Sequence, residues 1–268
     1  MQIGLLFQQF STTIYQDIKE RLNMKSSVEN VMSYKDINVP EEKLTIEIPS
    51  WDAVAQPLVD HARRQYEEMI NEPVDELTNE MVDALALPGV KTIQQLKQSG
   101  MEVYQRNQTQ LQFYNEVLPF ILKYYADNSN VILNSEERDS YVTDYLRQVK
   151  AYADQYDMPL EQYGREQLKL EGNINEQLEK RAEEDFIFKV IAHRVFENQG
   201  GRLDEEAYEQ FIHRNVVQQG ADEIELRERF SYNAFKEMMP EMSLSQDIYE
   251  YFSKRITFKI NPDAKLRV

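Results

Sequence analysis

Acid–base or metal chemistry in this chain would have to come from three histidines and 47 carboxylates, because its 268 residues include no cysteine. His61, His193 and His213 lie outside the H-E-x-x-H pattern of zinc enzymes and the Glu-x-x-His pairs of di-iron bundles. The acidic run at 183–185 looks like a metal cluster only in the linear sequence. Adjacent residues of a helix point in different directions, so this run predicts a solvated helix face.

Nucleotide and nucleophile chemistry has no recognisable motif in the sequence. There is no G-x-G-x-x-G, no G-K-[ST] and no G-x-S-x-G pattern. The lack of cysteine excludes disulfides, thiolate metal sites and thiol catalysis, and it fits a reducing compartment. We therefore expect no catalytic residue, no cofactor and no resident metal, and we look for the function in binding.

Charge limits the class of partner. Thirty basic residues against 47 acidic ones give a formal net charge of −17 and a pI of about 4.7. Nucleic acids and anionic membranes need a basic surface, so neither is an expected partner. No stretch reaches the roughly 20 apolar residues of a membrane helix. The apolar start has its first basic residue at Lys19, unlike a secretory signal, and we expect a cytoplasmic protein.

Hydrophobic periodicity predicts a mainly α fold with a minor β element. The predicted helices cover about 1–22, 51–70, 78–86, 92–126, 173–198 and 244–253. Pro57 is expected to kink its helix or delay the start, and Pro119 predicts a kink or break near 115. The alternating segments 44–48 and 255–260 predict short strands. We expect these strands to pair, because a lone strand leaves its backbone groups unsatisfied.

A motif of two helices joined by a short turn occurs twice. The copies cover residues 134–168 and 203–230. Each begins with a capping residue followed by glutamates: Asn134 or Ser135 in the first, Asp204 in the second. Carboxylates there complement the exposed N–H groups and the positive end of the helix dipole. Two hairpins joined by a long helix predict an elongated helical body with two projecting arms. We place the arms at about 134–170 and 203–239.

Tyrosine and methionine are the residue types best suited to binding in this chain. It has 16 tyrosines and 10 methionines. Methionine adapts to varied apolar partners, and tyrosine combines an apolar ring with a polar end. Taken singly, each of these residues is better explained as ordinary core. That explanation is weaker for the whole set, because thin hairpins have little interior. The predicted contact residues are Met158, Leu160, Tyr163, Val216, Val217, Ile224, Phe230, Met238, Met239 and Met242.

The stretch PVDELTNEMVDALALPGVKTIQQLKQSGMEVYQRN at 73–107 resembles the entry into the C-terminal domain of trigger factor, a bacterial chaperone. In that family a Pro-Glu-Leu-Thr pattern, an acidic-apolar helix and a Gly-Val turn precede a long charged helix. Both hairpins are similar to the arms of that domain, and IFKVIAHRVFENQGG at 187–201 resembles their connection. Residues 34–69 resemble the family's linker strand and helix. The resemblance covers about 73–258 and implies a cradle that holds polypeptides.

Two parts of the trigger factor family have no counterpart in this sequence. The Gly-Phe-Arg-Lys loop that docks the family on the ribosome is absent, and the first 33 residues are too few for its domain. Residues 70–73 leave no room for the proline-isomerase domain. We therefore expect neither ribosome docking nor isomerase activity. The predicted domains are an N-terminal helix, strand and linker helix at 1–72 and a trigger-factor-like helical domain at 73–268.

The sequence thus favours an ATP-independent holdase that binds apolar segments of unfolded or nascent polypeptides in a helical cradle. Burial of apolar surface, at about 25 cal/mol per Å², would drive binding. Many weak contacts would make the specificity broad. The alternative is a non-enzymatic scaffold or adaptor with one dedicated protein partner, a homodimer included, anchored by the helix 1–22. An enzyme such as a prolyl isomerase is the least favoured class, because no pocket chemistry is visible.

Overall fold

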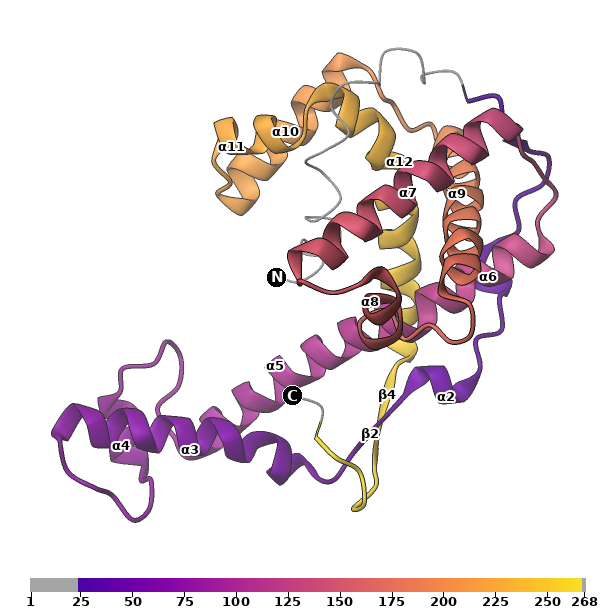
Figure 1. The fold of residues 1–268 in the computed structure, drawn as a ribbon. Coiled ribbons are helices and arrows are strands. Elements are labelled where there is room, and N and C mark those ends of the chain that lie inside the picture. Colours follow the sequence, from indigo (N-terminus) through magenta and orange to yellow (C-terminus); the bar gives the residue numbers. More distant parts are fainter. Residues whose placement is uncertain (1–23, 267–268) are drawn as a thin grey trace. The chain divides into compact units, whose positions relative to one another are not determined.

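The computed structural model describes residues 24–266 and consists of two compact units (Figure 1). Among the described residues, unit 1 comprises 24–37 and 121–248, and unit 2 comprises 38–120 and 249–266. The predicted helix 1–22 lies outside the described residues. The predicted domain boundary at 72/73 does not separate the units, because elements on both sides of it share one core in unit 2.

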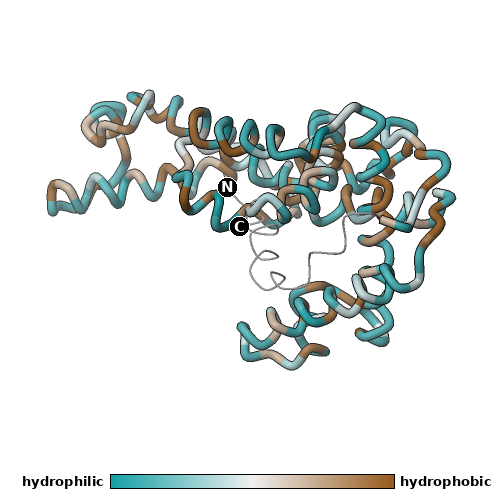
Figure 2. Tube along the Cα trace, turned by 90° about the horizontal axis from the view of Figure 1, so that it is seen from above, coloured by the Kyte–Doolittle hydropathy of each residue, from teal (hydrophilic) through white to brown (hydrophobic). Residues whose placement is uncertain are grey.

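Most of the described chain is helical, and the predicted mainly α class with a minor β element is confirmed. Apolar and polar residues alternate along the helical turns, as Figure 2 shows by colour. This alternation gives each helix one face that can be buried and one that water can cover.

In unit 2, α3 (Trp51–Ile70) packs against α5 (Ile93–Gln112), and the short α4 (Asn79–Ala84) contacts both. The residue before each helix is a serine or threonine whose hydroxyl accepts a hydrogen bond from the backbone N–H three residues later. These caps are Ser50, Thr78 and Thr92. The helices bury a common cluster made of Ala62, Leu77, Val82 and Leu96.

The two prolines in the predicted helices have different effects. Pro57 neither delays nor ends α3, which begins at Trp51 and holds the proline inside. Pro119 follows a π-helical turn, η3 (Phe113–Val117), which leads into α6 (Leu118–Asn128). Proline clashes with the carbonyl four residues earlier, and a wider turn relieves such a clash. The predicted irregularity near 115 is therefore confirmed, and it buries Phe113 and Val117.

The predicted strand pairing is also present in unit 2. Strand β2 (Thr45–Ile48) follows the single helical turn α2 (Glu41–Leu44) and pairs in parallel with β4 (Thr257–Ile260). The 3₁₀ turn η4 (Ser253–Arg255) precedes β4. Ile46 and Ile48 of β2 are fully buried, so this small sheet contributes directly to the core of the unit.

In unit 1, the predicted first hairpin is completed by a third helix. Asn134, not Ser135, caps α7 (Ser135–Gln155), which is followed by α8 (Leu160–Glu166). The long helix α9 (Ile174–Asn198) contacts both of them. Their shared core consists of Val149, Ala153, Tyr163, Ile174 and Leu178. Because α7 lies along α9, this segment is packed on its own unit (Figure 1).

The second hairpin consists of α10 (Glu205–Gln219) and α11 (Glu223–Arg229), joined by a turn at Gly220 in the left-handed conformation. Asp204 and Asp222 cap the two helices. Helix α12 (Tyr232–Phe252) follows as one continuous helix with Pro240 inside. The predicted last helix at 244–253 was therefore too short, because we assigned its first turns to the hairpin. Tyr208, Ile212 and Phe235 form the buried core that joins α10 to α12.

The start of the described chain is tied to unit 1 by a small strand pair. Strand β1 (Ser27–Val28) pairs antiparallel with β3 (Val131–Ile132), which lies directly before α7. The 3₁₀ turn η2 (Tyr34–Asp36) follows β1. These strands were not predicted, because two residues are too short to show alternation.

Candidate binding pocket and hairpin tip of unit 1

The ten predicted contact residues are placed in different environments. Met158, Leu160 and Tyr163 pack in the core of the first hairpin. Val216 and Met239 pack against the core that joins α10 to α12. These five side chains stabilise their own hairpins, so most of their apolar surface is already covered.

The other five predicted residues are more accessible to solvent, and their exposure differs. Phe230 is half-buried, with its ring centre 5.8 Å from that of Phe211. Met238 and Met242 on α12 are also half-buried. Val217 is 66% exposed and Ile224 is 70% exposed, which makes them the two members of the predicted set that present large apolar surfaces. They lie on either side of the α10–α11 turn, which we call the hairpin tip.

Polar contacts hold the α10–α11 hairpin in one geometry. The guanidinium of Arg227 binds both carboxylate oxygens of Glu209 at 2.8 and 2.6 Å and also Glu223 at 2.9 Å. The hydroxyl of Tyr208 donates a hydrogen bond of 2.7 Å to the backbone carbonyl of Phe230. Such exposed ion pairs add little stability, but a bidentate pair fixes orientation. Val217 and Ile224 are therefore presented on a defined hairpin.

Sequence reasoning did not find the pocket of about 930 Å³ that lies within unit 1. Its walls are residues 24–28, the first two turns of α7, one face of α9 and the beginning of α12. Both apolar and charged side chains line it, among them Phe186, Lys189 and Glu237. Its size is that of a site for a small molecule or a few residues of a peptide.

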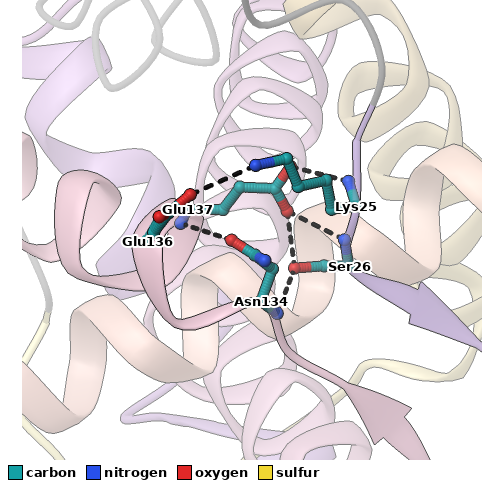
Figure 3. Close-up of polar contacts among 5 residues, drawn as sticks. All are labelled: Lys25, Ser26, Asn134, Glu136 and Glu137. Carbon is teal, nitrogen blue, oxygen red and sulfur yellow. Dashed lines mark hydrogen bonds and ion pairs between the residues drawn. The ribbon is translucent and has the colours of Figure 1, made fainter.

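One wall of the pocket is residues 24–28, which we call the strap. The carboxylate of Glu137 accepts hydrogen bonds from the backbone N–H of Lys25 at 2.6 Å and of Ser26 at 2.8 Å, and from the Ser26 hydroxyl at 2.7 Å (Figure 3). The Ser26 hydroxyl in turn accepts from the backbone N–H of Asn134 at 2.9 Å. Burial alone would raise the pKa of Glu137, but these hydrogen bonds outweigh it and lower that pKa.

Polar and charged side chains from three helices meet next to the pocket, and Tyr141 and Lys189 among them line it. Tyr141 of α7 donates a 2.8 Å hydrogen bond to the carboxylate of Asp185 on α9. The Lys189 ammonium lies 3.9 Å from a carboxylate oxygen of Glu241 on α12, and both side chains are under 20% exposed. Burial raises the pKa of Asp185, and it raises the pKa of Glu241 to about 7. The prediction that 183–185 is a solvated face was therefore wrong for Asp185, which lies on the inner side of α9.

His193 also lines this pocket, one turn beyond Lys189. Its Nε2 is buried and has no hydrogen-bond partner among residues 24–266. Burial, together with the nearby Lys189 charge, lowers the pKa of His193 to about 4, so the ring is neutral at physiological pH. A signal for this polar face of α9 was present in the sequence. Asp185, Lys189 and His193 recur every four residues in an otherwise apolar part of α9 and so share one helix face.

The arrangement provides binding surfaces, and it includes no group of metal-ligating side chains within the described part of the chain. No helix between residues 24 and 266 is long and apolar enough to span a membrane. Comparison with protein-family models, curated proteins and solved structures finds no match for this chain. The resemblance to trigger factor therefore stays a prediction from the sequence.

Proposed function

We propose that this protein is an ATP-independent chaperone that holds apolar segments of unfolded or nascent polypeptides. The observation that supports this function best is the hairpin tip, where Val217 and Ile224 are 66% and 70% exposed. A holdase needs apolar side chains that its own core has not covered. Removing them from water on contact with a client gives a favourable free energy of about 25 cal/mol per Å².

The surroundings of the hairpin tip favour transient binding. Two aliphatic side chains bury too little area for a permanent interface, so each contact would be weak and would release quickly. The same hairpin carries the Arg227 ion pairs and several exposed glutamates. Together with the net charge of −17, these would keep a complex with an aggregation-prone client soluble.

The pocket of unit 1 would give a client a second, more polar surface. Its walls combine apolar groups such as Phe186 with charges of both signs, so it suits main-chain and polar side-chain groups better than a purely apolar segment. The combination agrees with the cradle that the trigger factor resemblance implies. A cytoplasmic location belongs to the same proposal.

The test is the aggregation of a chemically unfolded client enzyme, followed by light scattering after dilution into buffer with and without the full chain. We expect near-stoichiometric protein to suppress scattering without ATP. The variant Val217→Ser with Ile224→Ser should lose at least half of this suppression, because it replaces both exposed aliphatic side chains. Neither position is in the core, so circular dichroism should be unchanged.

The matched control is Val103→Ser with Ile70→Ser, which replaces the same residue types at positions 45% and 38% exposed in unit 2. We expect this control to protect the client as well as the unaltered chain. If both double variants lost the same share of aggregation suppression, the hairpin tip would be excluded as the binding surface. No suppression with any of several clients would reject the holdase. A single stoichiometric partner, or a dimeric solution mass, would then favour the scaffold or adaptor.

A further inference from the structure

Within residues 24–266 the sheet of unit 2 consists of β2 and β4 alone, so one side of β4 has no strand beside it (Figure 1). Asn261, directly after β4, donates its backbone N–H to the carbonyl of Ile48 on β2 at 2.9 Å. The backbone groups of successive residues in a strand point to opposite sides, so those of Lys259 also face β2. The N–H and C=O groups of Phe258 and Ile260 therefore point away from β2. We call this side of β4 the open edge.

The side chains at the open edge include an apolar face that the core covers only in part. Phe258 and Ile260 lie on the core face of the sheet, because their register partners on β2 are fully buried. Ile260 itself is 57% exposed. The ring centre of Phe258 lies 5.4 Å from that of Trp51, at the start of α3. A third strand at the open edge would continue this face and cover Ile260.

The segment around the open edge is basic, although the chain as a whole is acidic. Residues 253–266 contain Lys254, Arg255, Lys259 and Lys265 against one carboxylate, that of Asp263. All four basic residues are exposed. An acidic partner complements these charges, whereas a second copy of the same strand would place like charges beside each other. The charge at this edge therefore favours an acidic peptide over a second copy of the chain.

We propose that the open edge of β4 binds an extended peptide segment, in which apolar and acidic residues alternate, as a third strand of the sheet. The main chain of the peptide would exchange hydrogen bonds with Phe258 and Ile260. Its apolar side chains would cover Ile260, and its carboxylates would lie beside Lys259 on the solvent face. Glu47, the register partner of Lys259, already accepts a hydrogen bond of 2.7 Å from the Asn261 side chain. This site belongs to unit 2 and does not depend on the holdase function of the hairpin tip.

Trp51, the single tryptophan of the chain, makes the binding measurable. Because its ring lies beside Phe258, a peptide at the open edge should change its fluorescence. The probe is a capped peptide of about six residues, an ordinary strand length, in which valine and glutamate alternate. It is titrated into the full chain at constant ionic strength, since the net charge of −17 repels anions when salt is low. We expect a saturable change, and none up to about 1 mM peptide would overturn the proposal.

Two altered peptides test the two parts of this recognition without any change to the protein. Methylation of every amide nitrogen removes the main-chain donors of the peptide, so binding should be lost. Replacement of the glutamates by lysines should weaken binding by at least about tenfold, because like charges would then lie beside Lys259. Unchanged binding of the methylated peptide would overturn strand addition. Equal binding of the lysine peptide would overturn the acidic partner class.

Variants of the chain test the position of the site. Ile260→Pro removes an N–H that points away from β2, so it should abolish binding and leave the pairing of β4 with β2 in place. Ile260→Val keeps that N–H and should bind as the unaltered chain does. Lys259→Gln should weaken binding about two- to fivefold. Lys150→Gln makes the same change in charge at an exposed position of α7 and should have no effect.

Two outcomes with these variants would overturn the proposal. The first is full binding by Ile260→Pro with an unchanged circular dichroism spectrum, because the peptide would then bind elsewhere. The second is a dimeric solution mass that Ile260→Pro converts to a monomer, because a second copy of the chain would then occupy the open edge. If Ile260→Pro fails to fold, the methylated peptide decides between strand addition and another mode of binding.

Discussion

The phenol of Tyr141 on α7 and the carboxylate of Asp185 on α9 form a hydrogen bond of 2.8 Å between helices that are far apart in sequence. The bond gives a buried carboxylate a hydrogen-bond donor. It also positions Tyr141 on the pocket wall.

Tyr141→Phe should destabilise unit 1. The change removes only the hydroxyl and leaves the carboxylate of Asp185 without this donor, which typically costs about 1–3 kcal/mol. Denaturant unfolding followed by circular dichroism would measure the loss. Tyr156→Phe is the control, because that tyrosine is 53% exposed and its hydroxyl can bond to water. Equal stability of the two variants would contradict the role assigned to the Tyr141 hydroxyl.

Glu137→Gln should release the strap. Its carboxylate accepts three hydrogen bonds from Lys25 and Ser26, and loss of the charge weakens them by about 1–3 kcal/mol in total. The expected result is faster amide exchange at residues 24–28 in the variant. Glu136→Gln, next in the chain, removes only an ion pair between side chains 64% and 80% exposed and should change exchange little.

The same carboxylate should make the strap sensitive to acid. Hydrogen bonds from the strap hold the pKa of Glu137 below 4.5 in the folded chain. Its contribution is therefore complete above pH 4.5 and is lost as the pH falls through the folded-state pKa. Amide exchange at residues 24–28 should accelerate below that pH in the unaltered chain and much less in Glu137→Gln. If exchange at residues 24–28 accelerated equally in both proteins at low pH, other carboxylates would be responsible for the acid sensitivity.

Gly164→Ala should destabilise the first hairpin although alanine is the better helix former. A β-carbon at Gly164 would lie 2.4 Å from the Cγ2 of Ile174, a branched side chain that is only 4% exposed and cannot turn away freely. Overpacking of this kind costs about 1–3 kcal/mol, against a propensity gain of about 1 kcal/mol. At Gly100 the nearest atom is the mobile end of Leu58 at 3.0 Å. Gly100→Ala should therefore be neutral or stabilising in thermal unfolding.

Ile48→Ala and Ile260→Ala should differ sharply although the two residues are register partners in the parallel strands β2 and β4. Ile48 is fully buried, and its truncation leaves a cavity that typically costs about 2–5 kcal/mol. Ile260 is 57% exposed, so its truncation should cost less than about 1 kcal/mol. Chemical unfolding monitored by Trp51, the single tryptophan, reports on unit 2. A similar loss of stability in both variants would contradict the assignment of Ile48 of β2 to the core of unit 2.

The helices and their ends were largely predictable, because their causes are local. Apolar residues three or four apart marked the buried faces, and Asn134, Asp204 and Thr92 cap the helices that follow them. The pairing of β2 with β4 was inferred from the need of each strand for a partner. Helix α12 was underestimated because its first turns were assigned to the second hairpin, and it continues through Pro240.

The sequence by itself determined the helical class, the places where helices begin, the acidic character of the surface and the absence of thiol chemistry. These follow from residue types and from spacings within a few turns. Only the tertiary structure decided which apolar residues stay exposed, because Met158 and Val217 look alike in sequence, yet packing covers one and leaves the other in solvent. It also decided that Asp185 meets Tyr141 and that Glu241 meets Lys189. Contacts between distant segments depend on how whole helices pack, and no local pattern encodes that.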